Sequence, residues 1–168
     1  MLKNKYIKYL IELFFLFFVI TITANIISIY RSANLNKEQL QATSFILSDG
    51  LKYITEENKP LIVHFWATWC PICRAELSNI EFISKHYQVL TVAVNSGSNN
   101  EMAEYAKKHK LNFKIINDSD GVMAKKFNIS MFPTTIIYNK NKNIAFIDTG
   151  YTSTLGILSK VWWAEKFN

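Results

Sequence analysis

Apolar residues follow two different patterns along the chain. Residues 9–30 are almost all apolar, and Glu12 is the one charged residue among them. Further along, short apolar runs alternate with stretches in which apolar residues recur every three or four positions. A short apolar run is typical of a strand buried on both faces, and the wider spacing is typical of an amphipathic helix. The pattern therefore predicts one long apolar helix followed by a domain of alternating strands and helices.

The elements expected after residue 60 follow one another as strand, helix, strand, helix, strand, helix, strand, strand and helix. Before them, the polar residues 48–50 lie between two apolar runs and predict a β-hairpin. Pro71 suits the first turn of a helix, and Asn99 or Asn100 is expected to cap the next helix. This order predicts an α/β domain with a central mixed sheet. The expected strands cover residues 61–66, 89–94, 113–116, 134–138 and 144–147.

The apolar segment 9–30 has the length of a membrane span. About 20 residues at ~1.5 Å each cover the ~30 Å hydrocarbon core of a bilayer. Three lysines precede the segment and only Arg31 follows it closely, so the positive-inside rule predicts a cytoplasmic N-terminus. We therefore expect a single-pass anchor in the cytoplasmic (inner) membrane, with the C-terminal part of the chain facing the periplasm or extracytoplasmic side.

Two other interpretations of this segment remain open. A cleaved signal peptide is one, although the apolar stretch is longer than the usual ~7–15 residues and no A-x-A site follows it. A helix buried in a globular core is the other. On the leading interpretation the chain has three parts: residues 1–30 with the N-terminal lysines and the transmembrane signal anchor, a tether over residues 31–44, and a domain over residues 45–168.

Composition and charge narrow the classes of function. Hydrophobic residues make up 49% of the chain and aromatic residues 14%, which excludes a disordered protein. The net charge of +6 is spread along the chain beyond the N-terminal lysines, so we expect no nucleic-acid partner. The chain has only 2 cysteines, too few for a scaffold held together by disulfides.

The two cysteines lie where a buried strand is expected to end and a helix to begin. Cys70 would occupy the N-cap region, where backbone N–H groups and the positive end of the helix dipole stabilise a thiolate. Cys73 would lie one turn further on, close enough to form a disulfide and shielded from solvent. This arrangement provides an attacking thiol and a resolving thiol, as exchange through a mixed disulfide requires.

Other uses of a C-x-x-C pair fit less well. A structural zinc site needs four ligands, and the three histidines show no ligand spacing. Covalent haem attachment needs a histidine directly after the second cysteine, where this chain has Arg74. An inert structural disulfide stays open, although so short a loop restrains the unfolded chain only weakly. We expect no metal and no organic cofactor beyond the redox-active disulfide Cys70–Cys73.

The run from Lys59 to Cys73 resembles the active-site segment of thioredoxin-fold proteins. It is more similar to the membrane-tethered TlpA-like group, and within that group to the ScsD-like disulfide oxidoreductases. The resemblance covers residues 45–168 and implies a thioredoxin-like fold, with a central mixed sheet flanked by helices. Further matching segments are Cys73–Glu76, Ser96–Gly97, Asn117–Gly121, Phe132–Thr134 and Gly150–Ser153.

The resemblance also assigns residues around the cysteines. It implies a cis peptide bond before Pro133 and a loop that faces the cysteine pair and binds the backbone of a substrate. X–Pro bonds are those at which a cis peptide costs least, and an ordinary trans proline is the alternative. The residues expected in this substrate-binding loop are Phe132, Pro133 and Thr134. The residues expected to pack around the site are Trp66, Trp69 and Pro71.

Two further positions are candidates for tuning the thiols. His64 stands where thioredoxin has a buried carboxylate, and a histidine with a pKa near ~6.5 would relay a proton to or from Cys73. The alternative is a buried, neutral histidine bonded to the backbone. Glu76 matches an acidic position of the TlpA-like group one turn past Cys73. It either tunes the thiols or is a solvated helix residue.

Three functions are open at this point. The leading one is a membrane-anchored, extracytoplasmic thiol:disulfide oxidoreductase. Its partners would be protein thiols and disulfides, together with a membrane electron donor or acceptor for the cysteine pair. The second is a dedicated reductant of apocytochrome c cysteines in cytochrome c maturation. The third, from another class, is a redox-inert peptide-binding or chaperone module.

Overall fold

The computed structural model describes residues 2–32 and 43–167, and within the first range it describes the side chains of residues 7–20, 22 and 23. The chain divides into two units, residues 1–34 and residues 35–168. The first contains helix α1 (Leu2–Ser32), whose described apolar side chains are exposed. Across the described residues, no helix is both long enough and apolar enough to cross a membrane. This finding does not confirm the predicted membrane anchor. Some of the side chains of residues 9–30 are not among those that the structure describes.

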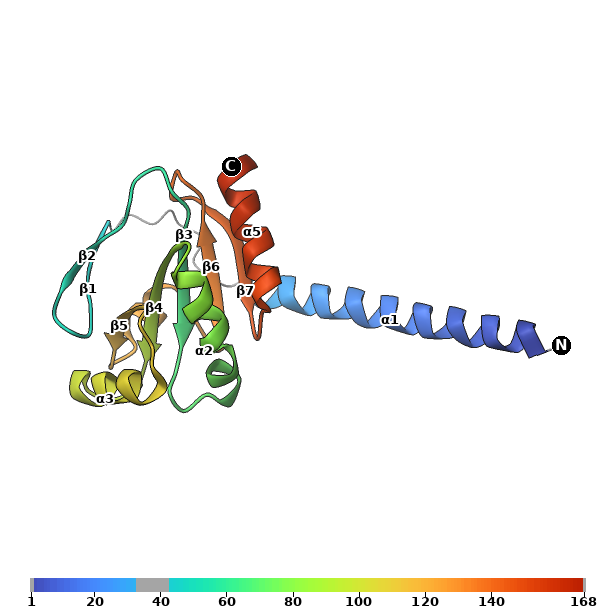
Figure 1. Ribbon diagram of the computed structural model, residues 1–168, viewed down its shortest axis with the longest axis horizontal. Coiled ribbons are helices and arrows are strands. Elements are labelled where there is room, and N and C mark those ends of the chain that lie inside the picture. Colours follow the sequence, from blue (N-terminus) through green and yellow to red (C-terminus); the bar gives the residue numbers. More distant parts are fainter. Residues whose placement is uncertain (1, 33–42, 168) are drawn as a thin grey trace. The chain divides into compact units, whose positions relative to one another are not determined.

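The second unit is built on a mixed sheet of five strands in the order β5-β4-β3-β6-β7 (Figure 1). β3, β4 and β5 are parallel, whereas β6 pairs antiparallel with β3 and β7 pairs antiparallel with β6. Each residue of the central strand β3 is buried, as expected for an apolar run covered on both faces. The predicted mixed sheet is confirmed. The strands are β3 (Leu61–Trp66), β4 (Gln88–Val94), β5 (Lys114–Asp118), β6 (Thr134–Tyr138) and β7 (Ile144–Thr149).

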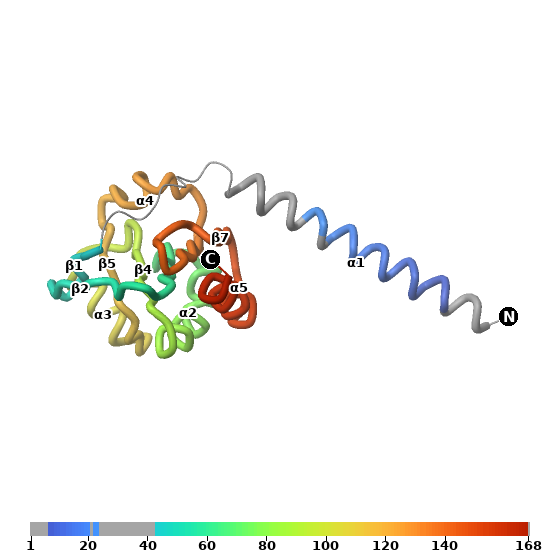
Figure 2. Tube along the Cα trace, turned by 90° about the horizontal axis from the view of Figure 1, so that it is seen from above, coloured from blue at the N-terminus to red at the C-terminus, as the bar shows by residue number. Residues whose placement is uncertain are grey.

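Helices cover both faces of this sheet. Figures 1 and 2 show α2, α3 and α5 on one face and α4 on the other. The residues of β3 alternate accordingly, with Ile62 and Trp66 in the core under α2 and α5, and Val63 and Phe65 in the core under α4. His64 therefore points toward the face that carries α2. The helices are α2 (Pro71–Ser84), α3 (Asn99–His109), α4 (Val122–Lys126) and α5 (Thr154–Phe167).

The predicted hairpin is confirmed and lies beside the main sheet. Strands β1 (Ser44–Ile46) and β2 (Lys52–Ile54) pair antiparallel around the turn at residues 48–50. In this turn the Asp49 carboxylate accepts the backbone N–H of Leu51 at 2.9 Å. The N–H of Ser48 donates to the carbonyl of Ile115 in β5 at 2.7 Å, which fastens the hairpin to the edge of the sheet.

The cap predicted for α3 is wrong by one or two residues. The N-cap is Ser98, whose hydroxyl accepts the backbone N–H of Glu101 at 3.3 Å. The Glu101 carboxylate accepts the backbone N–H of Ser98 in return, at 2.7 Å. This reciprocal pair satisfies two N–H groups that have no partner within the helix, which gives Ser98 the advantage over Asn99 or Asn100.

Candidate active site

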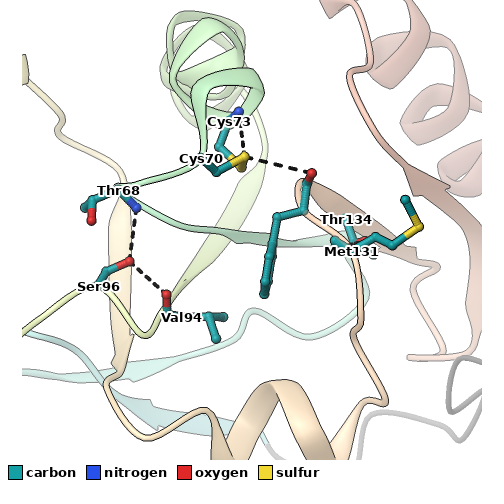
Figure 3. The surroundings of a disulfide bond; sticks show 8 residues. Thr68, Cys70, Cys73, Val94, Ser96, Met131 and Thr134 are labelled. Carbon is teal, nitrogen blue, oxygen red and sulfur yellow. Dashed lines mark hydrogen bonds between the residues drawn. A yellow bond between two sulfur atoms is a disulfide. The ribbon is translucent and has the colours of Figure 1, made fainter.

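The cysteine pair begins helix α2 as the sequence predicts. Cys70 is the N-cap, Pro71 occupies the first turn, and the Cys70 Sγ accepts the backbone N–H of Cys73 at 3.2 Å (Figure 3). The turn before the cap is held by β4, because the N–H of Thr68 donates to the Ser96 hydroxyl at 3.1 Å. That hydroxyl donates to the carbonyl of Val94 at 2.9 Å. The sulfur thus faces the N–H groups and the positive dipole end of the helix, where a thiolate is stabilised.

The two cysteines form a disulfide and differ in their access to solvent. Their Cα atoms are 5.3 Å apart. Cys70 is 6% exposed and Cys73 is 0% exposed. An external sulfur can therefore approach Cys70 and not Cys73, so the asymmetry between the two thiols that the motif predicts is present in the structure.

The loop before β6 faces the disulfide. The Phe132–Pro133 peptide bond is cis, which confirms the prediction. The Phe132 carbonyl oxygen lies 3.9 Å from the Cys70 Sγ (Figure 3). The loop is fixed from both sides, because the Thr134 hydroxyl donates to the Met131 carbonyl at 2.8 Å and the N–H of Gly150 donates to the Pro133 carbonyl at 2.8 Å.

The aromatic residues predicted around the site occupy two different levels. Trp66 is buried beneath the site and packs against Tyr105 and Phe113, at ring-centroid distances of 5.8 and 6.2 Å. Trp69 is 58% exposed and meets the Phe132 ring edge-on at 5.7 Å. The structure therefore brings Trp69 to the rim of the site and leaves Trp66 as support below it. Pro71 lies exposed beside Cys70.

Two cavities lie at opposite ends of the sheet. One of about 390 Å³ adjoins Phe132 and is lined mainly by the end of β4 and by α4. A larger one of about 520 Å³ is lined by Pro60, Gln88 and mostly polar neighbours, and neither cysteine lines either cavity. The smaller cavity is the one that adjoins the loop facing Cys70, through Phe132. Its lining residues are Val94, Asn95, Asp120, Gly121, Ala124, Lys125, Asn128, Ile129 and Phe132.

His64 is fully buried and neutral, which agrees with the second of its two predicted interpretations in all but the hydrogen-bond partner. Its Nδ1 lies 2.9 Å from the Thr135 hydroxyl, so its partner is a side chain and not the backbone. Its Nε2 has no hydrogen-bond partner among the described residues. Burial lowers the pKa of His64 to about 3. The expected pKa near neutrality is therefore wrong, and His64 is a neutral and weak base at neutral pH.

Glu76 is also buried, so its interpretation as a solvated helix residue is wrong. It is 0% exposed, and its Oε1 accepts the backbone N–H of Thr152 at 3.2 Å. Burial raises the pKa of Glu76 to about 7; the negative charge of Asp148 adds to this rise, and the Thr152 hydrogen bond opposes it. Because Cys73 and Glu76 are three residues apart on α2, they lie on the same side of the helix.

Sequence reasoning missed two residues that the fold brings to this side of the site. Asp148, in β7, forms a salt bridge with Lys160 of α5. The available signal was a charged residue directly after the otherwise apolar run from Ile144 to Ile147.

Across residues 2–32 and 43–167, no group of three or more His, Cys, Asp or Glu side chains is arranged to hold a metal ion.

Comparison with known proteins gives four findings. Residues 33–147 match the AhpC/TSA family. A "Thioredoxin-like protein" of Haemophilus influenzae is 32% identical over 172 residues, which cover 98% of each chain. The "Thiol-disulfide oxidoreductase ResA" of Bacillus subtilis is 27% identical over 135 residues, or 73% of this chain and 75% of that protein. A secreted disulfide oxidoreductase of Mycobacterium tuberculosis shares the fold, with a TM-score of 0.61 and 21% identity over 71% of this chain and 93% of that one.

Proposed function

Since this chain belongs to the AhpC/TSA family and is a thiol–disulfide oxidoreductase that exchanges dithiol and disulfide through its C-x-x-C pair, we propose that it acts outside the cytoplasm on the thiols and disulfides of other proteins. The observation that carries the proposal is the position of Cys70, at a helix N-cap and 3.9 Å from the Phe132 carbonyl. The name of one relative says that it is secreted, which supports this location. The alternative of a redox-inert module does not hold.

The reaction proceeds in two exchanges. When the chain acts as a reductant, the Cys70 thiolate attacks one sulfur of a substrate disulfide, and the other substrate sulfur leaves with the electron pair of the broken bond. Cys73 then loses its proton and attacks the Cys70 Sγ, which releases the second substrate sulfur and closes the Cys70–Cys73 disulfide. Two electrons pass to the substrate. The reverse sequence oxidises a substrate, and a membrane electron donor or acceptor returns the pair to its starting state.

The loop of Phe132, Pro133 and Thr134 is the proposed binding site for the substrate backbone. Its carbonyl next to Cys70 supports this role, since a chain joined to the Cys70 sulfur must pass beside it. Trp69 and the cavity next to Phe132 offer apolar contacts to the side chains of such a segment. No contact among these requires a particular substrate sequence, so we propose a range of protein substrates.

Glu76 is the proposed proton acceptor for Cys73. A group that accepts a proton at neutral pH works best with a pKa near 7, and the pKa of Glu76 is raised to about 7. Cys73 is fully buried and has no access to solvent for its proton. His64 is too weak a base for this role, and we propose that it acts as a neutral residue that orients Thr135.

The proposed organisation keeps residues 1–30 as the membrane anchor, residues 31–44 as a tether and residues 45–168 as the catalytic domain outside. Its support is the apolar segment 9–30, because a helix that is apolar on all sides is stable only inside a protein core or a membrane. A reporter active only outside the cytoplasm and fused after residue 168 is expected to be active. Activity of a cytoplasmic reporter at the same position would contradict the orientation.

Trapping of mixed disulfides tests the function itself. In Cys73→Ala, the Cys70 thiolate attacks a substrate and the mixed disulfide persists, because the resolving thiol is missing. Disulfide-linked complexes with other proteins are therefore expected on non-reducing gels, and mass spectrometry should place each link at Cys70. Cys70→Ala is the matched control and should trap nothing. Equal trapping by both variants would contradict the assigned roles.

A further inference from the structure

A row of polar side chains crosses the sheet beneath helix α2. In the strand register, His64 of β3 lies opposite Thr135 of β6, and Thr135 lies opposite Asp148 of β7. Residues directly opposite each other in a sheet point to the same face. All three side chains therefore point to the face that carries α2 and α5, the side on which Cys73 is buried.

The row ends at the surface in an ion pair. The Lys160 Nζ, from α5, lies 2.5 Å from the Asp148 Oδ1, and the two side chains are 32% and 15% exposed. Lys160 is thus the more exposed member of the pair. Asp148 lies further inside, where its negative charge acts on the carboxylate of Glu76.

Eight buried side-chain polar atoms have no hydrogen-bond partner within the part of the chain that the structure describes, and three of them belong to His64, Glu76 and Asp148. These three are His64 Nε2, Glu76 Oε2 and Asp148 Oδ2. A buried polar atom without a partner costs free energy. Two of these atoms belong to carboxylates that repel each other unless one of them holds a proton.

We propose that the Asp148–Lys160 ion pair controls how firmly Glu76 holds the proton that it takes from Cys73. The inference rests on the proposed role of Glu76. Asp148 and Lys160 touch neither the substrate nor the reacting sulfurs, so they are positioning residues. Asp148 favours the protonated form of Glu76 by like-charge repulsion, and Lys160 limits this effect by neutralising Asp148.

The proton balance of the step is simple. The S–H bond of Cys73 breaks and an O–H bond forms on Glu76, while the Cys73 thiolate attacks the Cys70 Sγ. The departing substrate thiolate takes up a proton from solvent, and Glu76 later gives its own proton back to solvent. Asp148 and Lys160 take no part in the proton transfer, and no further oxidant or reductant is involved.

The charged and titratable groups around Glu76 come from several elements. His64 of β3 is neutral near pH 7, since burial lowers its pKa to about 3. The Tyr151 hydroxyl, from the loop before α5, accepts a hydrogen bond from Asn79 of α2 at 3.1 Å. The groups facing this layer are Cys73 from α2, His64 from β3, Asp148 from β7, Tyr151 from the loop and Lys160 from α5.

The test is the pH dependence of the resolution step, in which Cys73 attacks a preformed mixed disulfide, measured by stopped flow on the full chain in detergent micelles. This rate should rise with pH as Glu76 loses its proton. Asp148→Asn removes the repelling charge and should move the midpoint of the profile to lower pH by about one unit. Lys160→Met leaves Asp148 uncompensated and should move it to higher pH by a similar amount. Lys160→Arg should restore the original midpoint.

Shifts of opposite sign separate control of the proton from a merely structural role. Lys166→Met, at an exposed position of the same helix, is the matched control and should leave the midpoint in place. A second readout does not depend on activity: the carboxyl ¹³C signal of Glu76, followed by NMR in the oxidised chain, should titrate with the same two shifts. Midpoints that stay in place, or that move in the same direction in both variants, would overturn the inference.

Failure of the inference is distinguishable from failure of the proposed function. If Glu76→Gln resolves the mixed disulfide as fast as the original chain, Glu76 is not the proton acceptor and the proposed role fails together with the inference. If Glu76→Gln is slow while the Asp148 and Lys160 variants keep the original profile, the proposed role stands and only the inference fails.

Discussion

On the Cys70 side of the disulfide, neutral side chains such as Trp69 and Ile72 reach the surface, and each is more than half exposed. On the Cys73 side, the carboxylate of Glu76 is fully buried, and an ion pair closes the layer toward solvent. The two regions share helix α2 and otherwise consist of different strands and loops. On the proposed roles, the difference separates two tasks: the exposed region binds substrates, and the buried region accepts the proton that exchange releases.

The first prediction tests the difference in access between the two thiols. In the reduced chain, Cys70 should react with iodoacetamide well below the pH near ~8.5 that a free thiol requires, and about 100-fold faster than Cys73. The reasons are its exposure and its position at the N-cap. Mass spectrometry of the labelled peptides at short times measures both rates. In the urea-unfolded control the two rates should be equal. Equal rates in the folded chain would contradict the difference in access between the two thiols.

The second prediction concerns the buried region alone. Glu76→Gln keeps an oxygen that accepts the Thr152 N–H and removes the proton acceptor. Resolution of a mixed disulfide should slow by a factor of about 10²–10⁴, while the first attack by Cys70 keeps its rate. Stopped-flow measurement of both steps checks this result. Glu104→Gln, at an exposed position of α3, is the control, and slowing of both steps in Glu76→Gln would mean that the two regions are not separate.

The third prediction concerns two buried groups, His64 and Glu76, which have opposite effects on how the free energy of unfolding depends on pH. The pKa of His64 is lowered to about 3, so the unfolded chain binds the extra proton and the free energy of unfolding falls as pH decreases from about 6.5 toward 3. The pKa of Glu76 is raised from 4.5 to about 7, so the folded chain binds the extra proton and stability falls as pH rises through that window. The two contributions reach at most about 5 and about 3 kcal/mol respectively.

Urea denaturation at pH 4 and pH 7.5 separates these contributions. His64→Phe should gain stability over the original chain mainly at pH 4, and Glu76→Gln mainly at pH 7.5. We also expect His64→Phe to resolve mixed disulfides within about twofold of the original rate, because so weak a base adds little at neutral pH. Gains of both variants at the same pH would show that one of the two pKa shifts is assigned in the wrong direction.

The smallest expected effect belongs to the exposed region. Trp69→Ala removes the ring that meets Phe132 at the rim of the site. For a peptide substrate, KM should rise about fivefold with kcat unchanged, which corresponds to about 1 kcal/mol of binding. Steady-state kinetics separates the two constants. Trp162→Ala, at an exposed position of α5, serves as control. A fall in kcat at unchanged KM would mean that Trp69 acts in the exchange step at the thiols and not in substrate binding.

The exposed region was largely predictable from the sequence. Its residues from Thr68 to Ile72 are contiguous, and the strand, turn and helix start around them follow from their own pattern. The cis bond before Pro133 required the family resemblance, because an isolated X–Pro pair is compatible with both isomers. The cap of α3 differs from the prediction for a local reason, because Ser98 and Glu101 form a reciprocal capping box that neither neighbouring asparagine has.

The buried region was predictable only in part. Glu76 and His64 were singled out, but the pKa of each depends on how deeply the fold buries it. The Asp148–Lys160 pair depends on the strand register and on where α5 packs, and neither is encoded in a short segment. A run of four apolar residues followed by an aspartate indicated only that one charge lies at the end of a strand.

The hydroxyl of Ser96 has a mechanical consequence. It accepts the N–H of Thr68 and donates to the carbonyl of Val94, so the turn before Cys70 is attached to the end of β4 (Figure 3). While a mixed disulfide exists, the substrate protein is covalently attached to the Cys70 sulfur, and its diffusion exerts a force on that sulfur. This attachment leads such a force into β4, which is hydrogen-bonded to β3 on one side and to β5 on the other. The turn before Cys70 is thus held by the sheet as well as by the first turn of α2.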